Sequence, residues 1–425
     1  MLVSIMFAAI VVLLLCGVPI AASFGLGSAL YLILAPRLPD LILAKTMVEG
    51  IDSFTLLAIP FFILAGNLMN VSGITERIFL FARTAVGHLP GGLGQVNIFS
   101  SLIFAGMSGS AVADAGGLGA VQAKEMIRQG YDADFAAGIT STSSTIGPII
   151  PPSIPMLVFA VLSSVSVRDL FLAGILPGVL MAAGLMVMTF FFARRRGYPV
   201  TESFSLRAVL REAVPALPAM LTPVLLVGGI TLGIVTPTES AVIVIGYALV
   251  LAGLVYHGLT FKTLWSVLRD TAETTATVML ILATAATFSW ILASEGVPQK
   301  AAMLLSGMVD RPLEFGLLIF VALLVVGTFM EAGAAMVILV PVFLPVADAV
   351  GMDRTHLGMI VVFTLMLGLI TPPVGLVLFV LSRAADIPVG RVIRGTMMFM
   401  APLLIVGLLI ATLPAISTGI PDLLR

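Results

Sequence analysis

The chain alternates long apolar runs with short polar stretches along its whole length. A helix rises about 1.5 Å per residue, so about 20 apolar residues are needed to cross the ~30 Å hydrocarbon layer of a bilayer. This pattern predicts an all-α integral membrane protein with about ten transmembrane helices. The apolar segments are 2–16, 20–35, 54–72, 97–124, 134–165, 170–193, 213–235, 238–257, 272–294, 313–349, 355–385 and 391–415.

Two of these segments are too long for one crossing and share a motif. Segment 134–165 contains Gly147-Pro-Ile-Ile-Pro-Pro152, and segment 355–385 contains Gly368-Leu-Ile-Thr-Pro-Pro373, 221 residues later. Both follow the pattern Gly-x-Ile-x-Pro-Pro. A proline pair removes amide donors and clashes with the preceding turn, so both segments are predicted to be discontinuous helices. Paired interruptions in two halves of a chain point to the substrate site of a secondary transporter.

Two further long segments have small residues at their centres. Segment 97–124 is interrupted around Gly106 and Gly109, and segment 313–349 around Gly327 and Gly333. We predict that each is a re-entrant helical hairpin that dips into the membrane and returns. Such a backbone is tolerated only where protein or a watery cavity covers it.

The repeat extends beyond the two motifs. At the same offset, Gly106 matches Gly327 and Gly174 matches Gly395. We therefore predict two halves, residues 1–200 and 210–425, each with five crossings and one hairpin whose interruptions meet at the membrane midplane. The predicted elements are scaffold helices within 2–72 and 213–294, hairpins 97–124 and 313–349, broken helices 134–165 and 355–385, and closing helices 170–193 and 391–415.

The basic residues predict how the halves are oriented. Arg194-Arg195-Arg196 follows the closing helix of the first half, whereas Arg383, Arg391 and Arg394 precede that of the second. Basic residues flanking membrane helices favour the cytoplasmic side. The two halves are therefore predicted to run oppositely through the membrane, as an inverted repeat, with both termini on the periplasmic side.

Composition narrows the class of protein. The 425 residues are 60% hydrophobic and 10% charged, with a mean hydropathy of +1.18, whereas a soluble domain has about 25% charged residues. The net charge of −1 argues against a nucleic-acid partner. The single cysteine, Cys16, excludes an internal disulfide. No ATP-binding phosphate loop is present, so transport must draw on an ion gradient or a partner protein.

Glycines and hydroxyl residues gather beside each predicted break. Unwound backbone leaves carbonyl oxygens unpaired, and these with hydroxyl oxygens suit a small cation such as Na⁺. The alternative is that small residues only let helices pack closely. Two clusters related by the repeat favour ion binding. The first predicted Na⁺ site consists of Ser108, Gly109, Ser110, Ser143, Ser144 and Gly147, and the second of Gly327, Thr328, Thr364, Gly368 and Thr371.

Four residues are candidates for substrate binding or coupling: Asp114, Thr145, Glu239 and Glu331. An ionisable residue inside a membrane is costly and indicates function by default. Asp114 and Glu331 follow the two hairpin tips, where each either balances cation charge or caps the returning half-helix. Glu239 ends Thr236-Pro-Thr-Glu239, which is also the pattern of a capping box. The positive ends of half-helices between the sites are expected to hold substrate carboxylates.

An enzyme is not expected. The sequence has no Ser/His/Asp spacing, no paired Asp motif and no His-x-x-Glu-His pattern.

Six motifs together, in order along almost the whole chain, resemble the large membrane subunit of tripartite ATP-independent periplasmic (TRAP) transporters. They are Gly17-Val-Pro-Ile20, Pro60-Phe-Phe-Ile-Leu-Ala-Gly66, Gly106-Met-Ser-Gly-Ser-Ala-Val-Ala-Asp114, Gly147-Pro-Ile-Ile-Pro-Pro152, Thr236-Pro-Thr-Glu239 and Ile370-Thr-Pro-Pro-Val-Gly375.

The resemblance implies an Na⁺-driven, elevator-type importer of small organic acids, such as C4-dicarboxylates or sialic acid, in the bacterial inner membrane. It implies two partners, a small four-helix membrane subunit and a periplasmic substrate-binding protein. By position, Ser108 and Asp114 match the family's first-hairpin motif and Glu239 its Thr-Pro-Thr-Glu motif.

Two other functions remain open from the sequence. One is a stand-alone Na⁺/organic anion symporter of related inverted-repeat fold, which transports without a binding protein. The other is a membrane channel or a scaffold that transports nothing, in which the serine clusters only pack helices.

Overall fold

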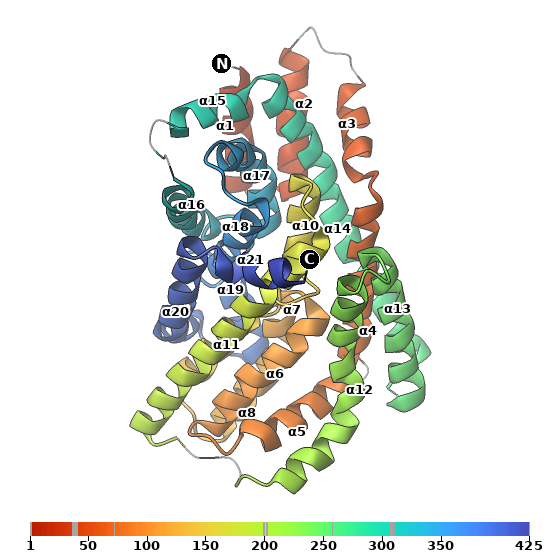
Figure 1. Cartoon of the computed structure of the whole chain (residues 1–425), viewed down its shortest axis with the longest axis vertical. Coiled ribbons are helices and arrows are strands. Elements are labelled where there is room, and N and C mark those ends of the chain that lie inside the picture. The colour runs from red at the N-terminus through yellow and green to blue at the C-terminus, as the bar shows by residue number, and fades with distance from the viewer. Residues whose placement is uncertain are drawn as a thin grey trace.

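The computed structural model describes residues 2–35, 41–71, 73–198, 200, 203–256, 258–306, 309 and 311–424. All secondary structure in these ranges is helical, as Figure 1 shows, which confirms the all-α prediction. Up to residue 200 the helices are α1 (Leu2–Leu15), α2 (Ile20–Leu34), α3 (Ile42–Ile51), η1 (Phe54–Leu57), α4 (Ala58–Val71), α5 (Ile74–Val86), α6 (Gly92–Ser108), α7 (Ala111–Asp114), η2 (Ala115–Gly119), α8 (Ala120–Arg128), α9 (Ala133–Ser144), α10 (Ile154–Ser163) and α11 (Val167–Arg196). Beyond it they are α12 (Leu206–Thr231), α13 (Pro237–Val250), η3 (Leu251–Val255), α14 (Phe261–Ser294), α15 (Val297–Ser306), α16 (Pro312–Gly327), α17 (Ala332–Ala349), α18 (Arg354–Gly368), α19 (Leu376–Ala385), α20 (Val389–Thr412) and α21 (Ala415–Leu423).

Within the described residues, six helices are long and apolar enough to cross a membrane. They are α11, α12, α13 continued by η3, α14, α17 and α20. A seventh span results if α4 and α5, which are bent by 69°, are counted together. The count of about ten crossings therefore stays a prediction.

Four helices lie largely or wholly outside the predicted apolar segments, namely α3, α5, α15 and α21. They were missed because a long apolar run identifies a membrane crossing and overlooks short amphipathic helices. α5, for example, carries Glu76, Arg77 and Arg83 among its apolar residues. The predicted segment ends at 72 and 257, and the terminal residues 1 and 425, lie outside the described residues.

Both Pro-Pro motifs interrupt their helices. α9 ends at Ser144 and α10 begins at Ile154, whereas α18 ends at Gly368 and α19 begins at Leu376. The Pro151–Pro152 and Pro372–Pro373 peptide bonds are both cis. Each proline lacks the amide that a continuing helix needs, so the chain turns before it resumes a helix.

The two hairpin segments reverse direction at their glycine and hydroxyl residues. α6 ends at Ser108 and is followed by Gly109, whose φ of +60° lies in the left-handed region that glycine adopts most readily. The returning arm is irregular, because Gly117 has non-helical angles (φ −92°, ψ −105°) between α7 and α8. The second hairpin turns at 328–331 and returns as the continuous helix α17.

The helices pack in groups that are distant in sequence. α14 contacts α2, α3, α4 and α17, and Figure 1 shows α2, α3 and α14 side by side. α12 contacts α5 and α13. The helix after each break packs on the opposite hairpin, because α10 contacts α17 and α19 contacts α7, η2 and α8. The two hairpin regions are therefore interlocked.

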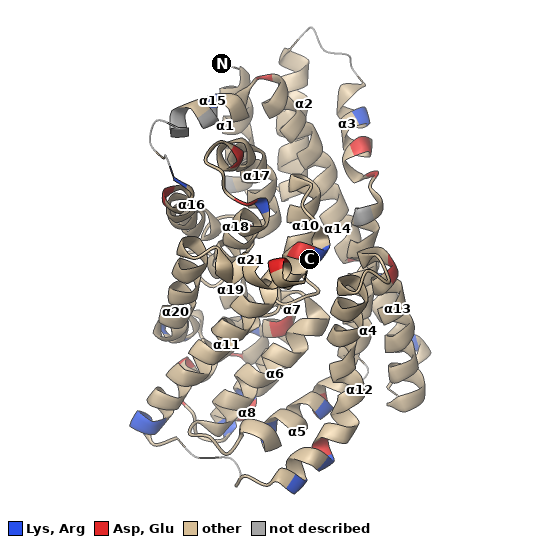
Figure 2. Cartoon of the chain, viewed as in Figure 1, with Lys and Arg blue, Asp and Glu red and all other residues tan. Residues whose placement is uncertain are grey.

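α11 and α20 run antiparallel. At the end of α11, an Arg196 guanidinium nitrogen lies 3.5 Å from the sulfur of Met398 in the first half of α20. Earlier in α11, a Cβ atom on Gly184 would lie 3.0 Å from the Cβ atom of Pro402, which comes later in α20. Figure 2 shows Lys and Arg at the lower ends of α11 and α12 and on α5 and α8.

The contact between α9 and α20 depends on glycine. A Cβ atom on Gly395 would lie 1.8 Å from the carbonyl oxygen of Asp134, and one on Gly138 would lie 2.3 Å from the carbonyl oxygen of Gly395. The backbones therefore touch directly. Arg391 and Arg394 flank the Asp134 carboxylate at 3.8 and 3.5 Å.

We predict that Gly395→Ala lowers the thermal stability of the purified protein strongly. Backbone cannot yield as a flexible side chain does, so α9 and α20 must separate, at a cost of about 1–3 kcal/mol or more. Gly390→Ala is the matched control in the same helix, because a Cβ there meets nothing within 4 Å. Melting temperatures in detergent test this, and equal values for the two variants would contradict it.

Candidate functional site

The tip of the first hairpin is enclosed by the first helix break and by α4. A Cβ atom on Gly109 would lie 2.5 Å from the carbonyl oxygen of Pro152, so the tip rests on the backbone of the proline pair. A Cβ atom on Gly66 in α4 would lie 2.8 Å from the carbonyl oxygen of Met107. Both close approaches require glycine. The tip is therefore fixed between the break and a neighbouring helix.

Asp114 lies beside this tip as a buried carboxylate with one free oxygen. Its side chain is 3% exposed, and Ser108 Oγ donates to Oδ1 at 2.5 Å. Oδ2 has no hydrogen-bond partner, and a Cβ atom on Gly147 would lie 2.4 Å from it. Asp114 is not the cap of the returning helix, because Ser110 accepts from the Ala113 amide at 3.3 Å in that role. The carboxylate instead faces the helix break.

This arrangement brings together Ser108, Asp114 and Gly147 from the hairpin and the break. A buried carboxylate oxygen without a donor is costly unless a cation or a proton compensates it. Na⁺ prefers hard oxygen ligands, and the non-helical backbone at 145–153 adjoins the carboxylate at Gly147. The chemistry of the donor set therefore fits a small cation.

The hydroxyl residues at positions 143–145, where α9 ends, divide into two groups. Ser144 and Thr145 each donate to a carbonyl three residues earlier, at 2.8 and 2.7 Å, which leaves the oxygen lone pairs free to accept. Ser143 instead faces α6, where its Oγ donates to Asn97 Oδ1 at 2.8 Å. The Ser143 hydroxyl is therefore engaged by a side chain of α6, whereas the hydroxyl oxygens of Ser144 and Thr145 can still accept a bond near the break.

The second predicted site also joins a hairpin tip to a break. A Cβ atom on Gly368 would lie 2.5 Å from the Cα, C and O atoms of Gly327, so the two glycine backbones are in direct contact. Thr328, Thr364 and Thr371 each donate to a carbonyl of the preceding turn, at 2.8, 2.6 and 2.7 Å. Their oxygens can still accept. The residues of this site thus come from the same kinds of element as those of the first.

A cavity of about 700 Å³ adjoins the second tip. Its lining includes the turn 17–20 between α1 and α2, the tip 327–331, and Leu369 and Gly375 from the second break. Space is therefore present between the second hairpin and the N-terminal helices.

The other two acidic candidates are helix caps. Glu331 is the N-cap of α17 and accepts from the Ala334 amide at 3.1 Å. Glu239 is exposed and forms the predicted capping box with Thr236, whose amide donates to Glu239 at 2.8 Å. Their geometry accounts for both carboxylates without a bound ion. Their roles in substrate binding or coupling stay predictions.

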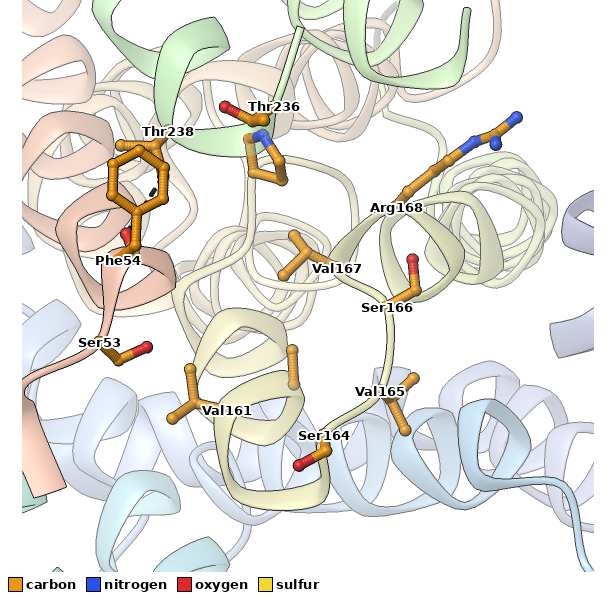
Figure 3. A pocket seen from close by; sticks show the side chains of 12 residues that line it. Ser53, Phe54, Val161, Ser164, Val165, Ser166, Val167, Arg168, Thr236 and Thr238 are labelled. Carbon is orange, nitrogen blue, oxygen red and sulfur yellow. Dashed lines mark hydrogen bonds between the residues drawn. The ribbon is translucent and has the colours of Figure 1, made fainter. Parts of the chain in front are cut away.

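A second pocket of about 490 Å³ lies where the α10–α11 loop faces the turn before α13 (Figure 3). Ser164 and Ser166 line one side, and Ser53 and Thr236 line the other. Figure 3 shows the Arg168 side chain extending away from the pocket. This pocket contains none of the predicted cation ligands.

Two residues that hold the elements of the first site together were not singled out as candidates from the sequence. Gly66 occurs only within a family motif, and Asn97 only as the start of an apolar segment. The available signal for Asn97 was an amide inside an apolar run, which is costly to bury unless it is hydrogen-bonded.

Comparison with known proteins identifies the family. The profile described as "Tripartite ATP-independent periplasmic transporter, DctM component" matches residues 7–416. The chain is 45% identical over 411 residues to the sialic acid TRAP transporter large permease protein SiaM of Vibrio cholerae, covering 97% of this chain and 96% of that protein. It is 38% identical over 402 residues to the C4-dicarboxylate TRAP transporter large permease protein DctM of Pseudomonas aeruginosa, covering 94% of each.

The fold resembles that of the YdaH transporter of Alcanivorax borkumensis, with a TM-score of 0.65 and 15% identity over 89% of this chain and 88% of that one. The resemblance inferred from the six motifs is confirmed. This chain belongs to the DctM family, the large permease component of the TRAP transporters, and is a membrane transport protein rather than an enzyme.

Proposed function

We propose that this chain uses an Na⁺ gradient to import a small carboxylate across the bacterial inner membrane. TRAP systems are tripartite, and the expected partners are the small four-helix membrane subunit and a periplasmic substrate-binding protein. The relatives are named for sialic acid and C4-dicarboxylates, which supports a carboxylate as substrate. Importing an anion against an inside-negative potential costs about 2.3 kcal/mol per charge per 100 mV, so a co-transported cation is needed.

The observation that carries the proposal is the free Oδ2 oxygen of the buried Asp114 carboxylate against Gly147. Its negative charge supports a cation at the first site, where Ser108 donates to the same carboxylate and the Ser144 carbonyl accepts from the Gly147 amide. The contact of Gly327 with Gly368 supports a second cation site related to the first by the repeat.

The antiparallel course of α11 and α20 supports an inverted repeat of residues 1–200 and 210–425. These helices close the two halves, and Arg196 and Gly184 of α11 lie beside Met398 and Pro402 of α20, so the two helices run in opposite directions. Their basic ends are expected in the cytoplasm and both chain termini in the periplasm.

An elevator mechanism is the expected mode of transport. The hairpins, the broken helices, α11 and α20 form the moving body, and helices within 2–72 and 213–294 form the scaffold. The interlocked hairpin regions support one moving body, because α10 and α19 each tie one half to the other. Gly66 in α4 marks a contact between this body and the scaffold.

Uptake into proteoliposomes tests the coupling. The two membrane subunits and the loaded binding protein are expected to accumulate substrate with an inward Na⁺ gradient, and not with an equal K⁺ gradient. Equal uptake in both would contradict the proposal. Uptake without the binding protein would favour the stand-alone symporter, and a substrate-independent current that survives Ser108→Ala would favour a channel.

A further inference from the structure

Asn97 forms a buried bridge between the first hairpin and the helix that precedes the first break. It lies in α6 and is fully buried. Its Nδ2 atom donates to Thr140 Oγ1 at 2.9 Å, and its Oδ1 atom accepts from Ser143 Oγ at 2.8 Å. Both ends of one amide are thus bound to α9. An apolar side chain at position 97 would leave both hydroxyls without these partners.

The bridge acts on the part of α9 that leads into the break. Ser143 is the next-to-last residue of α9, and its carbonyl accepts from the Ile146 amide at 3.1 Å. The next carbonyl, of Ser144, accepts from the Gly147 amide at 3.2 Å. The position of Gly147, against which Asp114 lies, therefore depends on where α6 holds the end of α9.

Asn97 cannot itself contact the cation. It lies eleven residues before Ser108 in the same helix, which is about 16 Å at 1.5 Å per residue. The same helix carries Ser108, which holds the Asp114 carboxylate, so α6 connects one side of the site directly to the bridge. The gap between Asp114 and Gly147 is set by how α6 and α9 are held together.

A second buried bond on α6 offers a comparison. Gln122 Nε2 in α8 donates to Ser100 Oγ at 2.6 Å, and both side chains are buried. This bond joins the two arms of the hairpin and does not involve α9. Its loss would disturb packing as the loss of the Asn97 bridge does, but would leave the position of the break unchanged.

We propose that Asn97 is a positioning residue for the first Na⁺ site, which it serves by fixing α9 and its break against the hairpin. This inference rests on the proposed Na⁺ coupling. Residues that hold metal ligands in place typically change metal affinity by about 10–100-fold when they are replaced. We expect the same here, although Asn97 donates nothing to the ion.

The test is the Na⁺ dependence of uptake by the complete transport system in proteoliposomes. Asn97→Leu should raise the Na⁺ concentration for half-maximal uptake about tenfold. The maximal rate at saturating Na⁺ should stay within about twofold, as expected for a lost positioning group rather than a lost reaction step. Thr140→Val, which removes only the bond from Asn97 to the Thr140 hydroxyl, should shift this Na⁺ concentration in the same direction, and Asn97→Leu with Thr140→Val should be no worse than Asn97→Leu alone.

Gln122→Met is the control and should leave the Na⁺ dependence unchanged. An unchanged Na⁺ dependence in Asn97→Leu, or an equal shift in Gln122→Met, would overturn the inference while the proposed function stands. If Asn97→Leu does not fold, Thr140→Val decides the matter in the same way, because it removes one of the two bonds of Asn97 and no other. Na⁺-independent uptake by the unaltered protein would instead refute the proposed function and this inference together.

Discussion

Replacing Asp114 by asparagine is expected to abolish Na⁺-driven uptake while the protein stays folded. Asparagine has nearly the same shape and can still accept from Ser108, but it removes the negative charge beside Gly147. Removing one partner of a buried ion pair costs about 3–5 kcal/mol. Because about 1.4 kcal/mol corresponds to a tenfold change, Na⁺ affinity should fall about a hundredfold or more.

Thermal stability separates this effect from unfolding. Na⁺ should raise the melting temperature of the unaltered protein, because a ligand stabilises the state that binds it. Asp114→Asn should lose most of that increase and be no less stable without Na⁺, since the uncompensated buried charge is gone. Glu125→Gln is the control, because Glu125 is partly exposed at the base of the same hairpin in a 3.8 Å pair with Arg128, and it should behave like the unaltered protein. Normal Na⁺-driven uptake by Asp114→Asn would rule out a charge role for this residue.

Gly368→Ala is expected to have the second largest effect. The new methyl group would lie 2.5 Å from three backbone atoms of Gly327, none of which is the end of a flexible side chain. The second hairpin must therefore move away from the second break, at a cost of about 1–3 kcal/mol. Uptake should fall by about tenfold or more, because the second cation site depends on this contact.

The matched control is Gly246→Ala in α13. It adds the same methyl group in a helix, where nothing lies within 4 Å. Alanine favours a helix over glycine by about 1 kcal/mol, so this control should be equally stable or slightly more stable. Uptake rate and melting temperature are measured for both variants. If Gly368→Ala transports as well as Gly246→Ala, close contact of the two glycines is not required.

The sequence was sufficient to locate the helix breaks, because a proline pair inside a long apolar run interrupts the helix that the run would otherwise form. It also marked Gly327 and Gly368 as parts of one site. It left Asp114 undecided between a charge and a cap. In the structure Ser110 caps the helix and Asp114 faces a glycine 33 residues later, so Asp114 is not the cap, and its role as a charge stays a proposal. Such a contact depends on how hairpin and break pack, which no local pattern encodes.

Two other features could not be predicted from the apolar runs. α5 and α15 are short and carry charged residues, so they do not look like membrane crossings. The Asn97 bridge depends on Thr140 and Ser143 lying opposite α6, which only the packing of α6 on α9 reveals. Conversely, the sequence Thr236-Pro-Thr-Glu239 predicted a capping box, and the structure confirms it. This prediction was possible because a capping box is a local pattern of four residues.

Direct binding of radioactive Na⁺ to the purified transporter tests the central claim, that each hairpin tip and its facing helix break hold a cation. The account predicts two sites in the unaltered protein, one of which is lost in Asp114→Asn and the other in Gly368→Ala. Two sites retained in both variants, or no saturable binding to the unaltered protein, would contradict it.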